Sequence, residues 1–172
     1  MKRQNYNGMF FGLLTLLLMF SFTVQAADVI VVPKKIPFGK ETMVRDNVRA
    51  ECKLEEKIAK FIVDYGKKHG YQIVDEKPAS GPYKILSAEI ITVVGAGGGA
   101  WSGAKSIKIK GDLKDQDGKV VGNFTAGRYS GGGAFAGYKG TCSILGRCTK
   151  AIGKDVAAWL ANPNTNSMLG DH

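Results

Sequence analysis

Side chains that could act as acids, bases or nucleophiles are few and lie far apart in the sequence. His69 is the only histidine besides the C-terminal His172, and it stands next to lysines at the predicted end of a helix. A positive side chain suits that position because it complements the helix dipole. Glu89 lies within an apolar segment, with no histidine or second carboxylate close to it in the sequence. Because general acid–base catalysis needs such groups held together, we predict no catalytic residue and a chain that is not an enzyme.

The three cysteines, Cys52, Cys142 and Cys148, indicate a disulfide rather than a metal site. They lack the Cys-x-x-Cys spacing of zinc ligands, and no nearby histidine could complete a ligand set. We therefore predict no metal and no cofactor. In an oxidising compartment two of the three cysteines would normally pair, which leaves one thiol free.

The positions of the cysteines on the predicted helices favour one pairing. Cys148 falls on the apolar stripe of the last helix, so we expect it to behave as a small buried hydrophobic residue. Cys52 and Cys142 each lie near the start of a predicted helix, and right-handed crossovers would bring these two starts to the same end of the domain. The favoured bridge is Cys52–Cys142, and the alternative is a local Cys142–Cys148 bridge.

The first residues have the three parts of a secretory signal peptide. Lys2 and Arg3 give a positive start, an apolar run follows over residues 9–24, and the small residue Ala26 precedes the expected cleavage site. The alternative is an uncleaved membrane anchor, but an anchor needs about 20 apolar residues and this run is shorter. We expect residues 1–26 to be a signal peptide, the protein to be periplasmic, and the mature chain to contain no transmembrane segment.

The chain carries a formal net charge of +9, spread along its length rather than concentrated in one block. Outside the cytoplasm a positive surface is attracted to lipid headgroups, lipopolysaccharide and cell-wall polymers. A general contribution to solubility is the alternative explanation. The expected partner is another envelope protein or an anionic envelope component, and no nucleic acid is expected.

The hydrophobic pattern predicts a single α+β domain over residues 27–162, followed by a flexible C-terminal tail over residues 163–172. Strands are expected at 29–36, 71–74, 83–94, 105–113 and 119–126, and helices at about 45–68 and 143–161. The order is β-α-β-β-β-β-α, which gives an antiparallel-rich sheet with two helices on one face, a two-layer sandwich. Within the strand at 105–113, Ile107 and Ile109 should face the core while Lys108 and Lys110 face outward.

Two glycine-rich segments repeat the same pattern, GGGAWSGAK over residues 97–105 and GGGAFAGYK over residues 131–139. Each follows a strand running in the same direction, so both should lie at one end of the sheet. A nucleotide-phosphate loop is excluded, because its Gly-Lys-Ser/Thr spacing at the start of a helix is missing. The glycines either allow close packing and positive φ angles, or form a contact surface for a partner. The candidate binding residues are Trp101, Lys105, Phe135, Tyr138 and Lys139.

Two stretches resemble known families. Residues 71–75 (YQIVD) with 83–90 (YKILSAEI) are similar to a strand pair in envelope-assembly domains such as the N-terminal domain of the Tol-system translocation protein and curli-secretion-type lipoproteins. Residues 97–160, which include GGGAWSGAKS and KGTCSILGRC, resemble a family of small secreted bacterial proteins catalogued as a domain of unknown function. The second resemblance implies a periplasmic location and this fold, but no established activity.

Two functions of different classes are compatible with these patterns. The first is a non-enzymatic periplasmic binding or assembly protein of the cell envelope that uses the glycine-aromatic loops as its contact surface. The alternative is a small periplasmic hydrolase or isomerase with an unrecognised site near those loops. A pocket beside the glycine loops that held Glu89 and another titratable group would favour the enzyme.

Overall fold

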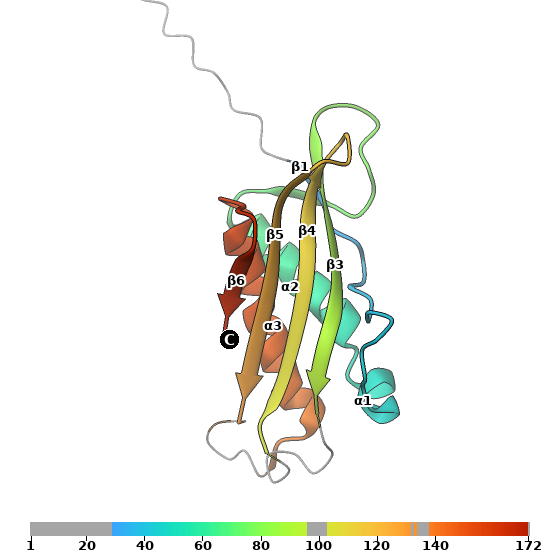
Figure 1. Cartoon of the computed structure of the whole chain (residues 1–172), viewed down its shortest axis with the longest axis vertical. Coiled ribbons are helices and arrows are strands. Elements are labelled where there is room, and N and C mark those ends of the chain that lie inside the picture. The colour runs from blue at the N-terminus through green and yellow to red at the C-terminus, as the bar shows by residue number, and fades with distance from the viewer. Residues whose placement is uncertain (1–28, 96–102, 132, 134–137, 172) are drawn as a thin grey trace, which may run out of the picture.

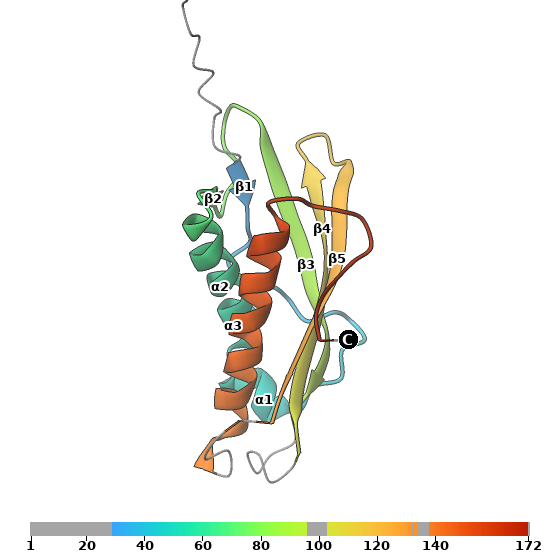
Figure 2. The same ribbon diagram turned by 90° about the vertical axis from the view of Figure 1, so that its left-hand side faces the viewer.

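The computed structural model describes residues 29–95, 103–131, 133 and 138–171. Its elements in chain order are β1 (Val29–Val31), α1 (Asp46–Glu51), α2 (Leu54–Lys68), β2 (Gln72–Val74), β3 (Tyr83–Val94), β4 (Lys105–Asp115), β5 (Val120–Ser130), α3 (Thr141–Trp159) and β6 (Ser167–Gly170). The six strands form one mixed sheet in the order β2-β1-β3-β4-β5-β6, and α2 and α3 cover one of its faces (Figures 1 and 2). The predicted α+β sandwich is confirmed.

The long strands β3, β4 and β5 form an antiparallel meander whose residues alternate between the two faces of the sheet. On β4, Ile107 and Ile109 are fully buried against the helices, whereas Lys108 and Lys110 are exposed on the opposite face. This alternation is the predicted register, and it leaves one face of the meander open to solvent. The short connection between β4 and β5 is a tight turn, closed by hydrogen bonds to Asp115.

The predicted single helix over residues 45–68 is wrong, because the structure has two helices, α1 and α2, with a break between them. Lys53 adopts a left-handed conformation with φ 49° at the break. An unbroken helix would place Cys52 almost opposite the apolar stripe that begins at Leu54. The break allows the side chains of both Cys52 and Leu54 to be buried. It also lets Cys52 reach Cys142 at the start of α3.

The predicted flexible tail over residues 163–172 is wrong for Ser167–Gly170, which form β6 and pair in parallel with β5. Hydrogen bonds from the core secure this segment despite its polar composition. The indole Nε1 of Trp159 donates to Ser167 Oγ at 3.0 Å, and the backbone N–H of Asn123 donates to Asn164 O at 3.2 Å. Polar side chains here make specific contacts with the sheet instead of remaining in water.

Candidate functional site

The two glycine-rich segments leave the sheet at the same end. Both β3 and β5 run antiparallel to β4, so they finish together, at the lower end of the sheet in Figure 1. At this end Val94 pairs with Ser106 and Lys105 pairs with Ser130. We call this region, where β3 and β5 end and β4 and α3 begin, the glycine end. Trp101 and Phe135 lie outside the described residues, so their proximity stays a prediction.

Lys105 does not contribute to a contact surface, and that prediction is wrong. Its exposed fraction is 0%, and its Nζ donates to the carbonyl oxygen of Gly103 at 2.7 Å. The cause is the alternation of β4, which places Lys105 on the same face as Ile107, towards the helices. Its ammonium group therefore acts inside the glycine end, where it holds the chain that enters β4.

The structure supports the conformational explanation of the glycines. Gly103 and Gly133 have φ angles of 87° and 64°, a region that side chains with a Cβ rarely adopt. These two positions therefore need glycine for backbone reasons alone. The role of these segments as a contact surface for a partner stays a prediction.

Large apolar side chains are exposed around the glycine end. Tyr138, a predicted contact residue, is 92% exposed just before α3, while Lys139 beside it is half-buried. Met43 is 90% exposed, Tyr129 66% and Val94 51%. Among the described residues, these four are two thirds of the exposed large hydrophobic side chains, because only Val120 and Met168 lie elsewhere. The exposed apolar surface is thus concentrated at one end of the molecule.

A hollow of about 580 Å³ lies within this surface, between the end of β3 and the segment that leads into α1. Met43 and Val94 line it with Arg45, and Val93 and Val48 form its buried part. Sequence reasoning missed Met43 and Arg45, because they lie in an irregular segment that has no hydrophobic period.

The Cys52–Cys142 disulfide is present, so the favoured pairing is confirmed. It joins the end of α1 to the first turn of α3, with 4.8 Å between the two Cα atoms and a sequence separation of 90. The bridge fixes the segment that carries Met43 next to the helix that follows Tyr138. A disulfide that closes such a long loop fits a protein that folds outside the reducing cytoplasm.

Cys148 is a free, buried thiol on the face of α3 that packs against the sheet, as predicted. Burial raises the pKa of Cys148 to about 11. Its Sγ lies 3.9 Å from the carbonyl oxygen of Lys105, a weak hydrogen bond at most. A neutral, enclosed thiol of this kind has the character of a packing residue rather than a nucleophile.

Glu89 lies in the middle of β3, on the open face of the sheet, away from the glycine end. Its Oε1 is 3.0 Å from Nζ of Lys110, its cross-strand neighbour, and both side chains are more than a third exposed. The hydrogen bond to Glu89 raises the pKa of Lys110. Both side chains line a concavity on this face of the sheet, and Asp112 lines it as well. This arrangement is a solvated ion pair, and it does not match the enzyme site considered from the sequence.

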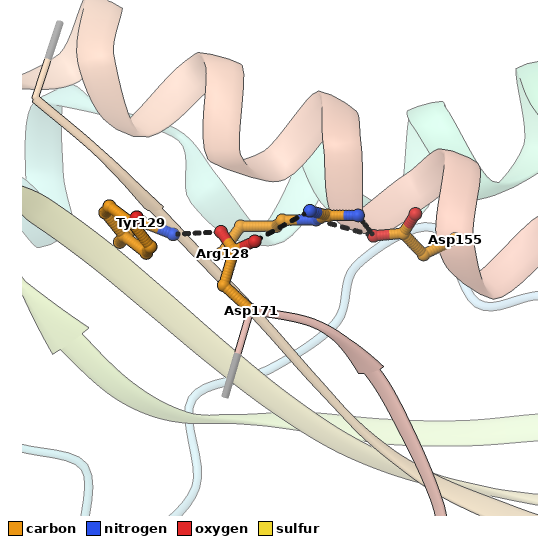
Figure 3. Close-up of polar contacts among 4 residues, drawn as sticks. All are labelled: Arg128, Tyr129, Asp155 and Asp171. Carbon is orange, nitrogen blue, oxygen red and sulfur yellow. Dashed lines mark hydrogen bonds and ion pairs between the residues drawn. The ribbon is translucent and has the colours of Figure 1, made fainter.

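An ion-pair cluster on Arg128 secures the C-terminal strand beside the glycine end (Figure 3). The guanidinium lies 2.7 Å from Asp155 of α3 and 3.0 Å from Asp171, which follows β6. Asp171 also accepts a hydrogen bond from the backbone N–H of Tyr129 at 3.2 Å. Sequence reasoning missed this cluster, because its members are distant in the chain and meet only through the pairing of β5 with β6.

Two structural findings bear on other classes of site. Within residues 29–95, 103–131, 133 and 138–171, no group of three or more His, Cys, Asp or Glu side chains could hold a metal ion. In the same ranges, no helix has the length and apolar character needed to cross a membrane.

No protein-family model matches the chain, and no curated protein matches it. Among solved structures, the chain is similar to the PelC dodecamer from Paraburkholderia phytofirmans, with a TM-score of 0.47 and 14% sequence identity. A substituted form of the same dodecamer gives a TM-score of 0.46, also at 14% identity. Each alignment covers 74% of this chain and 87% of the PelC chain.

Proposed function

We propose that this protein is a non-enzymatic binding or assembly protein of the cell envelope, and that it contacts another envelope component through the glycine end. The observation that carries the proposal is the concentration of exposed Met43, Val94, Tyr129 and Tyr138 at that end. Large apolar side chains gathered on one part of a surface are typical of a protein contact site. Tyrosine and methionine are also enriched at such sites, because they supply contact area and adapt their shape.

The charge around these side chains suggests the chemistry of the partner. Arg45 lines the hollow, and Arg147 projects towards Gly133, with its Nη1 about 3.4 Å from the position that a Cβ there would occupy. Lys139 lies next to Tyr138. An apolar centre with positive side chains around it favours a partner with an apolar patch bordered by carboxylates or phosphates. The proposed partner is therefore an envelope protein or an anionic envelope component.

The periplasm is the proposed location. The disulfide supports it, because Cys52 and Cys142 would remain reduced in the cytoplasm. The signal-peptide pattern at residues 1–26 supports it as well, although these residues lie outside the described part of the chain.

Substitution of the exposed apolar side chains tests the proposal. Met43→Asp and Tyr138→Asp should each reduce co-purification of the partner from chemically crosslinked, solubilised envelopes by about tenfold, because a central interface residue contributes more than about 1 kcal/mol. Val120→Asp is the matched control, since Val120 is 40% exposed and lies at the opposite end of β5. Equal recovery of the partner with all three variants would exclude the glycine end as the contact surface.

A further inference from the structure

A second concave surface runs along the flank of α2, at the border of the sheet formed by β2. It arises because β1 and β2 have only 3 residues each, whereas β3 has 12. Figure 2 shows these two short strands beside one end of α2, with the rest of the helix continuing past them. The helix flank and the segments that follow β1 and β2 enclose a groove of about 670 Å³. We call it the α2 groove.

The floor of the α2 groove is apolar. Val32, Ala59 and Ile73 contribute buried side chains, and Val63 and Val74 are half-buried and open towards the groove. These residues come from β2, α2 and the segment after β1. Together they form an apolar strip that is partly accessible to solvent.

The rim of the α2 groove is strongly basic, with five lysines: Lys34, Lys53, Lys57, Lys60 and Lys67. Lys57, Lys60 and Lys67 lie on α2 at spacings of three and seven residues, so they share one side of the helix, and Lys53 is the residue just before it. The rim has two carboxylates, Glu56 and Asp75. The lysines therefore give this border of the molecule a net positive charge.

The two rim carboxylates are already paired. Lys35 lies 2.8 Å from Glu56, and Lys34 lies 3.0 Å from Asp75. These hydrogen bonds lower the pKa of both carboxyl groups.

The remaining lysines of the rim differ in their ion pairing. Lys60 pairs with Asp64 on its own helix. In the described part of the chain, no salt bridge involves Lys53, Lys57 or Lys67. Three ammonium groups therefore stand beside the apolar floor without a bridging carboxylate.

We propose that the α2 groove binds a free fatty acid, with its alkyl chain along the apolar floor and its carboxylate beside Lys53 and Lys57, which are four residues apart at the start of α2. Burial of methylene groups favours the tail, and charge complementarity orients the head group. A carboxylate is also the group that Lys34 of this rim already binds, in its pair with Asp75. The proposal is independent of the function proposed for the glycine end.

Two other occupants fit the groove less well. A second copy of the chain related by a two-fold axis would bring one lysine rim against another, which is repulsive. A peptide strand added to the edge of β2 would form few main-chain hydrogen bonds, because β2 has only 3 residues. A fatty acid needs neither a matching surface nor a long strand edge.

Calorimetric titration of the purified mature chain with sodium dodecanoate, below its micelle concentration and at low salt, tests the proposal. One saturable site is expected. Decanoate should bind up to about fifteenfold more weakly, because each methylene buried contributes about fourfold. Dodecyltrimethylammonium has the same tail length and the opposite charge, and it should show no saturable binding.

Variants locate the site. The double substitution Lys53→Glu and Lys57→Glu should weaken dodecanoate binding by about tenfold or more. Lys108→Glu is the matched charge control on the open face of the sheet, and it should leave the affinity unchanged. Val63→Thr keeps the side-chain volume but adds a hydroxyl group to the floor, so it should weaken binding of dodecanoate several-fold. Circular dichroism and thermal melting establish that each variant is folded.

Three outcomes would overturn the proposal: equal binding of the cationic and anionic amphiphiles, no effect of the lysine double substitution, or no saturable binding of dodecanoate. A dimer in sedimentation analysis that Val63→Asp disrupts would assign the groove to a second copy and would also overturn it. Recovery of the envelope partner in the Met43 and Tyr138 experiment should be unaffected by the lysine double substitution. Failure of one proposal is therefore distinguishable from failure of the other.

Discussion

Lys105 and Lys108 belong to the same strand and have opposite environments. Lys105 shares its face with Ile107 and is buried, whereas Lys108 points to the open side and is exposed. Residue type alone would place both lysines in water. The two-residue period of β4 decides which of the two is exposed. The same period, extended from Ile107 back to the start of the strand, also predicts that Lys105 faces the core.

The register of β4 can be tested with two neighbouring substitutions. Ile109→Asp should destabilise the domain by about 4 kcal/mol or more, because it buries a charge without a partner. Lys108→Glu should change stability by about 0.5 kcal/mol or less. Urea denaturation followed by circular dichroism measures both free energies of unfolding. Similar values for the two variants would contradict the register.

The buried thiol of Cys148 predicts a pH dependence of stability. Its pKa is raised to about 11 in the folded protein, above the ordinary value of 9.0 for a thiol. The stabilisation is fully present below pH 9 and is lost as the pH rises through 11, because the unfolded chain ionises first. Between pH 8 and pH 10.5 the loss attributable to this thiol should be about 2 kcal/mol.

Urea denaturation of the native protein and of Cys148→Ala at these two pH values isolates the contribution of the thiol. The alanine variant lacks the ionisable group, so its stability should fall less over the same range. If both proteins lost the same free energy of unfolding, the thiol would not be held neutral by burial.

At the scale of elements, most of the secondary structure could be predicted from local patterns. Continuous apolar runs and alternation predicted β3 with the observed bounds and β4 closely, because these strands contribute a full face to the core. The break between α1 and α2 could not be predicted in this way. The break turns Cys52 inward, where it meets Cys142 from the start of α3. A contact between distant residues has no local pattern.

Strand β6 was missed for a similar reason. Residues 163–172 are polar and contain little that a hydrophobic pattern can detect. Their order depends on hydrogen bonds to Trp159 and Asn123 and on the pairing of Asp171 with Arg128. These partners belong to β5 and α3, so the strand forms only after those elements are packed.

The contact between Arg128 and Asp171 should stabilise β6 on the sheet. Asp171→Asn weakens the ion pair and the hydrogen bond from Tyr129, so it should cost about 1 kcal/mol, a value reduced by partial exposure of the carboxylate. The amide hydrogen of Tyr129 should exchange faster with solvent. Asp117→Asn in the β4–β5 turn is the control. Unchanged exchange at Tyr129 would show that this contact does not hold the strand.

For the whole molecule, the disulfide is the covalent link between the N-terminal and C-terminal helices. It connects α1, next to the Met43 segment, with the start of α3, next to Tyr138. The sequence predicted this pairing because the helix starts were expected to share one end. The exposed apolar surface at that end was predicted only in part, since Met43, Val94 and Tyr129 have no local signal that marks them as contact residues.

Removal of the disulfide should lower the free energy of unfolding of the domain. Replacing both Cys52 and Cys142 by alanine should lower it by about 4 kcal/mol, because the bridge joins cysteines with a sequence separation of 90 and so restricts the unfolded chain. Urea denaturation measures the loss, and hydrogen exchange should rise first in α1. Cys148→Ala is the control that retains the bridge. A loss below about 1 kcal/mol would mean that packing alone holds the two helices together.

The glycine end as a contact surface is the central claim, and crosslinking in intact cells tests it most directly. A photoreactive amino acid placed at Tyr138 lies on the proposed surface, and the same amino acid at Gln116, in the turn at the opposite end of the sheet, is the control. The claim predicts that illumination attaches one envelope component to the protein from position 138 and none from position 116. Capture of the same component with equal yield from both positions, or from position 116 alone, would contradict it.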